Sequence, residues 1–525
     1  MLAAQSTSFD LALLQILRGL LSMKYKNVSI LKLAMVSTLV IMIPITTNLS
    51  HVNTPKIFYY SVARQAFIIE RADGTESRLL AHYFLPAGHT QIVGAGWSPS
   101  GQWFSWTSQR ANGLGANNVY ITSRDGQTNI TLFPEDVILQ ESLWSPTDDY
   151  LLVRVDPSFN DVSVYDPGTN EFLEKIVGRE LSMNGGEVIF SAEWSPDGRL
   201  LALYDHGSDT VRIVAIGEDR ATQVFPARGT PLGGCEFGRL PHWIDSKHLA
   251  YLDPIHNQLI IRDIQTGTLT SIEMPEKDVD HADWTSDGNY ALIYTVGASY
   301  IDKLWLLSRD TESVQLLSED ALYGTNCRAP FNHTFWNSIN QAFFVSDVME
   351  LYLVEAEKQE AIKIMPSVQG AINAEEDIQW TPEGNLEFLW YVPELHGIQV
   401  YRYLTDAQAF ILVDPELPTL TSHASVVSIS NQGYRAYGDF IINPATGERF
   451  ATEIQTTRNY GPLGIVDVRW HPTKDWLFLI SSEIEDLDLI NVRNLDGTVQ
   501  LELGLCPLYS KTCFGWLPDE VVIKR

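Results

Sequence analysis

The chain of 525 residues lacks the common sequence motifs of catalytic and cofactor-binding sites. The Gly-x-Ser-x-Gly motif, which holds a nucleophilic serine on a strained turn, does not occur, and its nearest approach at residues 96–100 lacks the final glycine. Gly94 and Gly96 begin like a dinucleotide-binding fingerprint, but Pro99 stands where the third glycine belongs. There is no phosphate-loop lysine motif and no His-Glu-x-x-His pair, and the histidines are scattered. The sequence therefore predicts no catalytic residue, no cofactor and no metal site.

A local group of acidic residues near the C-terminus is a further candidate for metal binding. It consists of Glu483, Glu485, Asp486 and Asp488. Because their order does not match an EF-hand loop, we interpret the group as a solvated loop.

The four cysteines are too few for a disulfide-dependent scaffold and form no Cys-x-x-Cys pair. They are Cys235, Cys327, Cys506 and Cys513. The last two bracket a short loop that contains a proline, which could close as a disulfide in an oxidising compartment. The alternative is that they are isolated buried thiols.

The charge of the chain is strongly acidic and unevenly distributed. The formal net charge is -29, and residues 1–55 hold four basic residues and one acidic residue, a net +3 that leaves -32 for the remainder. A body with this charge repels phosphate backbones, so nucleic acid is not an expected partner. With 45% hydrophobic residues, the chain has enough apolar surface for a globular core.

The N-terminal region has the residue order of an export signal. Lysines precede a mostly apolar run at 33–45, and the polar stretch 46–50 follows it. We therefore interpret residues 28–48 as a signal peptide or a signal-anchor helix, with the body outside the cytoplasmic membrane, in the periplasm or at the cell surface. Residues 1–27 are then a cytoplasmic segment, or a misassigned extension if translation begins at Met23.

An internal repeat decides the fold class. Ten positions with intervals of 41 to 52 residues carry a Trp-Ser-Pro-Asp-Gly-like motif, with isoleucine in place of tryptophan at one of them. We call these ten positions the comb: Trp97, Trp144, Trp194, Trp243, Trp284, Trp336, Trp380, Ile429, Trp470 and Trp516.

Each motif is typical of a strand end followed by a tight turn, because proline fixes φ, Asp or Asn caps the turn and glycine adopts conformations that other residues resist. An apolar run follows nearly every turn, as at 200–204 and 476–480, and Asp-Gly-type hairpin signals come later in the period. Each period thus predicts four short strands, the size of one propeller blade.

The comb resembles the WD40-like repeats of the TolB propeller family and of the propeller domains of dipeptidyl-peptidase and tricorn-type proteases. The resemblance covers roughly residues 56–525 and implies a propeller that binds protein or polymeric ligands. We expect an all-β fold: a single large β-propeller of about eight to ten four-stranded blades, preceded by an N-terminal hydrophobic helix. Two smaller rings are the alternative.

The two ends of the repeat region predict how the ring closes. Residues 56–61 and 66–70 are later strands of a blade with no motif strand before them, while residues 514–516 form a motif strand near the C-terminus. Pairing them completes one blade and removes exposed strand edges.

The repeat, the export signal and the lack of catalytic motifs predict a non-catalytic scaffold that binds a protein or polymer on a propeller face. The membrane is a further contact if the signal is not cleaved. The alternative is a hydrolase or lyase whose groups converge in the central channel from several blades.

Overall fold

The repeat region folds as one compact unit, Pro55–Arg525, distinct from a second unit, Met1–Thr54. The computed structural model describes residues 54–517 except for a set of connecting segments. These segments are 62–65, 83–88, 111–115, 133–138, 156–161, 177–189, 206–208, 217–220, 230–239, 277–278, 296–300, 323–335, 338, 346–349, 367–369, 373–377, 382, 393, 395–396, 414–426, 431, 438–439, 444–445, 447, 452–464, 483–486, 496 and 508–513. The expected N-terminal helix at 28–48 lies outside the described residues.

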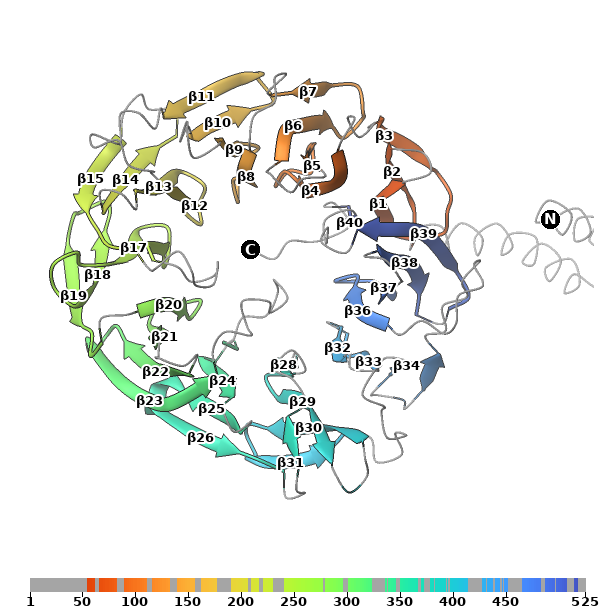
Figure 1. Ribbon diagram of the computed structural model, residues 1–525. Coiled ribbons are helices and arrows are strands. Elements are labelled where there is room, and N and C mark those ends of the chain that lie inside the picture. The colour runs from red at the N-terminus through yellow and green to blue at the C-terminus, as the bar shows by residue number, and fades with distance from the viewer. Residues whose placement is uncertain are drawn as a thin grey trace, which may run out of the picture. The chain divides into compact units, whose positions relative to one another are not determined.

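The unit is an all-β propeller with ten blades (Figure 1), at the upper end of the expected range and in one ring rather than two. Within each blade the described strands pair antiparallel, and where the first strand is described it lies nearest the ring centre. Blade 1 consists of β40 (Phe514–Trp516), β1 (Lys56–Ser61), β2 (Ala66–Arg71) and β3 (Arg78–His82). Blade 2 consists of β4 (His89–Trp97), β5 (Trp103–Arg110), β6 (Ala116–Ser123) and β7 (Asn129–Thr131).

The next four blades follow the same plan. Blade 3 has β8 (Leu139–Trp144), β9 (Leu151–Val155), β10 (Val162–Asp166) and β11 (Glu171–Ile176). Blade 4 has β12 (Phe190–Trp194), β13 (Leu200–Asp205), β14 (Thr210–Ala215) and β15 (Ala221–Pro226). Blade 5 has β16 (His242–Trp243), β17 (His248–Leu252), β18 (Gln258–Asp263) and β19 (Leu269–Glu273). Blade 6 has β20 (Val279–Trp284), β21 (Tyr290–Thr295), β22 (Ile301–Ser308) and β23 (Ser313–Leu322).

The remaining blades are less regular. Blade 7 has three described strands, β24 (Gln341–Val345), β25 (Leu351–Glu355) and β26 (Glu360–Ile364), with the 3-10 helix η3 (Ala356–Lys358) between the last two. Blade 8 has β27 (Ala371–Ile372), β28 (Ile378–Trp380), β29 (Leu386–Val392), β30 (Gly397–Leu404) and β31 (Ala409–Leu412). Blade 9 has β32 (Val427–Ile429), β33 (Arg435–Tyr437), β34 (Phe440–Ile442) and β35 (Arg449–Ala451). Blade 10 has β36 (Ile465–Trp470), β37 (Trp476–Ser482), β38 (Leu487–Asn494) and β39 (Gln500–Pro507).

The predicted closure is confirmed. β40 pairs antiparallel with β1 over three residue pairs, from Ile57 opposite Trp516 to Tyr59 opposite Phe514. We call this pairing the closure seam. Aromatic side chains pack on it: the Phe514 ring lies 4.9 Å from Phe478 of blade 10, and the Phe58 ring lies 5.3 Å from Phe104 of blade 2. Because three residue pairs give little ladder energy, side-chain packing must supply much of the stability of the seam.

Comb positions end the first strand of nine blades, and Trp336 lies just ahead of β24 in the tenth. The turn after Trp194 shows the expected chemistry. The Ser195 hydroxyl donates to the Asp197 carboxylate at 2.7 Å and accepts the Leu200 N–H at 2.9 Å, while Gly198 adopts φ +70°. Ser195 is fully buried, and these bonds satisfy its hydroxyl.

Comb tryptophans also join neighbouring blades. The Trp144 indole N–H donates to the Gly96 carbonyl at 3.2 Å, and the Trp194 indole donates to the Leu143 carbonyl at 3.4 Å. Trp243 and Trp336 do the same to the carbonyls of Glu193 and Asp283. In each case the acceptor is the residue just before the comb position of the preceding blade. At these four positions tryptophan supplies an N–H donor as well as an apolar ring.

Blade 9 carries isoleucine at the comb and shows a different link to its neighbour. Arg435 of β33 donates to the carboxylate of Glu387 of β29 at 2.9 Å, and Arg402 of β30 donates to the same carboxylate. Glu387 and Arg435 are both buried. A buried carboxylate held by two guanidiniums is satisfied, so this cluster has a structural role.

Candidate functional site

Blades with four described strands carry turns on one side of the ring, between their first and second strands and between their third and fourth strands, except that in blade 1 the closure seam takes the place of the first turn. Because the strands are antiparallel and consecutive, these turns all emerge on the same side. We call this side the turn face. It carries the two charged regions described next.

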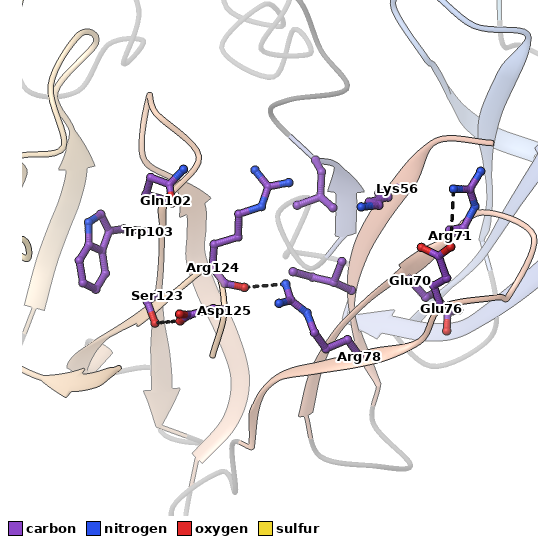
Figure 2. A pocket seen from close by; sticks show the side chains of 12 residues that line it. Lys56, Glu70, Arg71, Glu76, Arg78, Gln102, Trp103, Ser123, Arg124 and Asp125 are labelled. Atoms are coloured by element: carbon purple, nitrogen blue, oxygen red, sulfur yellow. Dashed lines mark hydrogen bonds and ion pairs between the residues drawn. The ribbon is translucent and has the colours of Figure 1, made fainter. Parts of the chain in front are cut away.

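A cleft of about 530 Å³ opens on the turn face between blades 1 and 2 (Figure 2). Its lining comes from the ends of β1, β2 and β3, from the turns before β5 and after β6, and from the residue that follows β40. The lining residues are Lys56, Ile69, Glu70, Arg71, Glu76, Arg78, Gln102, Trp103, Ser123, Arg124, Asp125 and Leu517. We call it the seam cleft, because Leu517 directly follows β40 and its N–H donates to the Lys56 carbonyl at 3.1 Å.

Two cations lie directly opposite each other in the seam cleft. Lys56 of β1 and Arg71 of β2 are partners in the antiparallel register, so their side chains share one face of the blade. Like charges at such a pair of positions destabilise a sheet by a few tenths of a kcal/mol to about 1 kcal/mol. An anion bound between the two side chains would offset this repulsion.

The anions near Arg71 compensate only partly. Asp73 lies 4.0 Å from its Nε, and Glu76 lies 4.0 Å from its Nη1. Neither distance is that of a hydrogen bond. Nε and Nη2, the two nitrogens along one edge of the guanidinium, are shielded from solvent and have no hydrogen-bond partner among the described residues. This edge matches the two oxygens of a carboxylate or phosphate.

A second contact joins blade 1 to blade 2 below these cations. The Arg78 guanidinium donates to the Arg124 carbonyl at 2.6 Å, and Figure 2 shows the Arg124 side chain pointing away from this hydrogen bond. The turn of blade 2 sits close to blade 1 because Gly126 has φ +74°, and a Cβ there would lie 2.8 Å from the Leu80 carbonyl oxygen. Hydrogen bonds from Ser123 and the Gln127 N–H lower the pKa of Asp125, which caps this turn.

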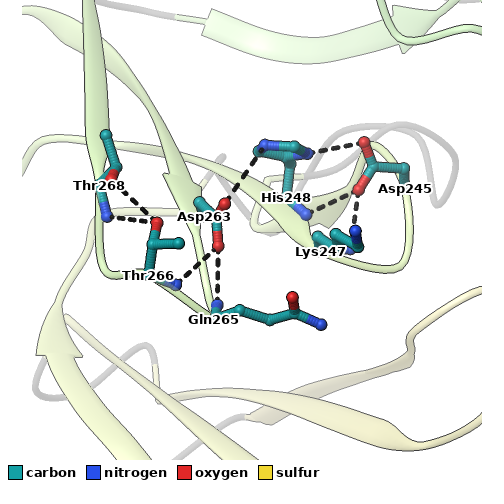
Figure 3. A network of polar contacts seen from close by, with 7 residues as sticks. All are labelled: Asp245, Lys247, His248, Asp263, Gln265, Thr266 and Thr268. Carbon is teal, nitrogen blue, oxygen red and sulfur yellow. Dashed lines mark hydrogen bonds and ion pairs between the residues drawn. The ribbon is translucent and has the colours of Figure 1, made fainter.

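The turn face of blade 5 carries a polar network of a different kind (Figure 3). The Asp245 carboxylate accepts the N–H groups of Lys247 and His248 at 2.7 and 2.8 Å, and it lies 2.7 Å from His248 Nδ1. Asp263 accepts the N–H groups of Gln265 and Thr266. The Thr266 N–H and then that of Gln265 hold the pKa of Asp263 below its ordinary value. Both carboxylates of this blade 5 network are therefore satisfied by their own turns.

A third group of titratable residues lies on the innermost strands, one position before the comb. Glu193, His242 and Asp283 occupy this position in blades 4, 5 and 6. Glu193 Oε1 lies 2.8 Å from His242 Nδ1, and the second carboxylate oxygen of Glu193 accepts the Trp243 N–H at 3.3 Å. Asp283 Oδ2 is buried and has no hydrogen-bond partner among the described residues. We call these three residues the ring-centre group.

Two members of the ring-centre group have a raised pKa. Burial raises the pKa of Asp283 to about 7, against a smaller opposing effect of His242. Desolvation lowers the pKa of His242, but the charge of Glu193 and the hydrogen bond to it outweigh desolvation, so the pKa is raised. A third of the His242 side chain (32%) is open to solvent. Glu193 occupies Nδ1, which leaves Nε2 to exchange protons with a bound molecule.

The sequence predicts no site residue, and neither the seam cleft nor the ring-centre group has a linear motif. One signal in the sequence does point to the ring-centre group. The position directly before the comb residue recurs in every period, and in three consecutive periods it holds an ionisable residue. Among the described residues, no three His, Cys, Asp or Glu side chains are grouped so as to hold a metal ion. In the acidic group, residues 483–486 lie outside the described residues. So do Cys513 and the side chain of Cys506, so the predicted disulfide stays a prediction.

Comparisons with known proteins support the fold and no closer relationship. No family model matches the chain, and no curated protein matches its sequence. A eukaryotic initiation factor of known structure is similar over 89% of this chain and 98% of its own, with 11% identity and a TM-score of 0.50. Dipeptidyl peptidase 4 of Porphyromonas gingivalis matches over 86% of this chain and 58% of its own, with 10% identity and a TM-score of 0.42. Kluyveromyces lactis Hsv2 matches over 61% and 96%, with 12% identity and a TM-score of 0.34. At these identities the likeness shows a propeller fold alone.

Proposed function

We propose that this chain is an exported, TolB-like propeller, anchored in the membrane or secreted, that binds a protein or polymeric ligand without catalysing a reaction. The observation that carries the proposal is the seam cleft: an open cleft on the face of a closed ring, with buried guanidinium donors that the described residues leave unpaired. A donor that is unsatisfied in the free chain destabilises the fold, and a ligand that accepts its hydrogen bond recovers that free energy on binding.

Export rests on the charge order around residues 28–48, with lysines before the apolar run and an acidic body after it. Within the described part of the chain, no helix is long and apolar enough to cross a membrane. The test of location is protease treatment of intact cells, which should digest the body. Protection of the body until the cells are lysed would contradict export.

Binding is tested by affinity capture of the full-length chain from crosslinked cells, followed by rebinding of each captured molecule to the purified chain. We expect a molecule that rebinds at a fixed stoichiometry and is competed by excess untagged chain. Reproducible recovery of the bait alone would contradict a scaffold function.

The ring-centre group favours a second candidate function, acid–base catalysis by a hydrolase or lyase. The Glu193–His242 pair supplies an oriented imidazole, and Asp283 can hold a proton near neutral pH, so one group can accept a proton while the other donates one. A screen of the purified chain against hydrolase and lyase substrates, with and without divalent metals, tests this candidate. We expect any turnover to be lost in His242→Gln and Asp283→Asn. If the wild-type chain turns over no substrate, or if its activity survives both substitutions, the catalytic function is eliminated.

A further inference from the structure

The seam cleft lies at the one place where the two ends of the propeller chain meet. Lys56 begins β1, the strand that pairs with β40, and the Lys56 carbonyl accepts the N–H of Leu517 directly after β40. Arg71 is the cross-strand partner of Lys56. A ligand held by these two cations would therefore contact the residues that close the ring.

We propose that the seam cleft binds a carboxylate-bearing segment of a partner protein, with Arg71 and Lys56 as its anion contacts, and that the bound carboxylate reinforces the closure seam. The inference rests on the proposed binding function and adds the class of ligand, the residues that recognise it and its effect on the ring.

The case for an anion comes from positive charge that its neighbours compensate only partly. Lys56 and Arg71 face each other across the strand pair, and the Nε and Nη2 edge of Arg71 is buried without a partner among the described residues. A buried, unsatisfied charged donor is destabilising, and a bidentate carboxylate would recover the lost free energy. The same anion would also offset the repulsion between Lys56 and Arg71.

The case for a carboxylate on a peptide comes from the rest of the lining. Glu70, Glu76 and Asp125 line the same cleft, and the body of the chain is strongly acidic, so a polyphosphate or nucleic acid would be repelled. A single carboxylate is recognised at short range, where the two cations dominate. Ile69, Trp103 and Leu517 supply apolar lining beside the cations. This combination suits an acidic residue flanked by apolar ones.

Glu76 acts as an internal competitor for the ligand. Its side chain is 64% exposed, its carboxylate lies 4.0 Å from Arg71 Nη1, and its backbone has φ +54°, a left-handed conformation that few non-glycine residues adopt. An exposed side chain moves away at little cost. Because Glu76 lies beside Nη1, its movement uncovers that nitrogen, and we infer that Nη1 is the first guanidinium donor that the ligand meets.

The experiment measures binding of the purified full-length chain to an array of short peptides, in which each Asp- or Glu-containing sequence has a matched Asn or Gln version. We expect acidic peptides with flanking apolar residues to bind about tenfold more tightly than their amide versions, as one charge-assisted hydrogen bond predicts. Arg71→Gln and Lys56→Gln should each abolish the preference, and Glu76→Gln should strengthen acidic binding severalfold.

The control is Lys363→Gln, which removes a cation of blade 7 that pairs with Glu350 away from the cleft. It changes the net charge by the same amount and should leave the preference intact. If Arg71→Gln does not fold, Lys56→Gln at the start of its strand decides the question. A folded wild-type chain with no preference for acidic peptides would overturn the proposal, as would a preference that survives both cleft substitutions.

Hydrogen exchange tests the effect on the ring. A bound acidic peptide should slow amide exchange in β1 and β40 of the wild-type chain, and the same peptide should have no effect on Lys56→Gln. If the peptide binds but amide exchange in these strands is not slower, the claim that the bound carboxylate reinforces the closure seam is overturned. A partner captured from cells that binds Arg71→Gln and Lys56→Gln as well as wild type would overturn this inference and leave the scaffold function standing.

Discussion

The seam cleft and the blade 5 network occupy the same face of the ring and use the same two kinds of turn. In blade 5 the turns supply N–H donors to Asp245 and Asp263, so each charge is satisfied where it arises. In the seam cleft the facing charges are Lys56 and Arg71, and a tight turn offers few acceptors to a cation. The turns of blade 5 thus satisfy their carboxylates locally, whereas the Nε and Nη2 edge of Arg71 is left without a partner among the described residues.

This difference separates structural charges from charges available for recognition. A satisfied carboxylate contributes stability, and its loss should weaken the fold. An unsatisfied cation costs stability, and its loss should weaken binding while leaving the fold unharmed. The ring centre adds a third case, because Asp283 Oδ2 is buried and has no hydrogen-bond partner within the described part of the chain.

The largest effect is expected at the seam itself. Phe514→Ala removes a buried ring that packs against Phe478 and should lower the free energy of unfolding by about 3–5 kcal/mol. Urea denaturation measures the change. The matched control is Phe344→Ala in blade 7, equally buried, which should cost a similar amount without accelerating hydrogen exchange in β1. Equal acceleration in both variants would contradict a local role for Phe514 at the seam.

The next largest effect concerns pH at the ring centre. Asp283 has a folded pKa raised to about 7, so between about pH 4 and pH 7 the folded chain retains a proton that the unfolded chain has lost. Stability contributed by this group therefore falls as the pH rises through that window. We expect Asp283→Asn to remove about 2 kcal/mol of the difference in unfolding free energy between pH 5 and pH 8. An unchanged pH profile would contradict the burial of this carboxyl.

A smaller effect is expected in the blade 5 network. Asp245→Ala leaves the N–H groups of Lys247 and His248 without their acceptor and should destabilise the chain by about 1 kcal/mol. Its peptide preference should match wild type, since the network is not part of the cleft. A loss of acidic-peptide binding in this variant would break the distinction between the two regions.

The smallest effect separates the two regions most sharply. Lys56→Gln relieves the repulsion with Arg71 and should raise the free energy of unfolding by a few tenths of a kcal/mol. Lys363→Gln removes an exposed ion pair and should lower it by a similar amount. Thermal denaturation of both variants at low salt measures these two changes in the free energy of unfolding. A destabilised Lys56→Gln chain would mean that the lysine already has an adequate partner.

The fold could be predicted from particular residues. Trp-Ser-Pro-Asp-Gly at Trp194 encodes a strand end, a buried hydroxyl and a left-handed glycine, all within five residues, and the structure shows each of them. The closure followed from residues 56–61 and 514–516, because a blade missing its first strand requires one from elsewhere. The indole N–H bonds between blades were not predicted, because they depend on how far neighbouring blades lie apart.

Neither candidate site could be predicted in the same way. Lys56, Arg71 and Arg124 are ordinary cations in the sequence, and only the register of β1 with β2 and the approach of blade 2 place them in one cleft. Glu193, His242 and Asp283 are separated by 49 and 41 residues, since each directly precedes its comb residue. The sequence by itself determined the repeat, the turns, the number of comb positions and the acidic charge of the body, because these follow from local backbone preferences and composition. The tertiary structure alone decided which charges are satisfied and which face a cleft, because burial and pairing between blades are properties of the closed ring.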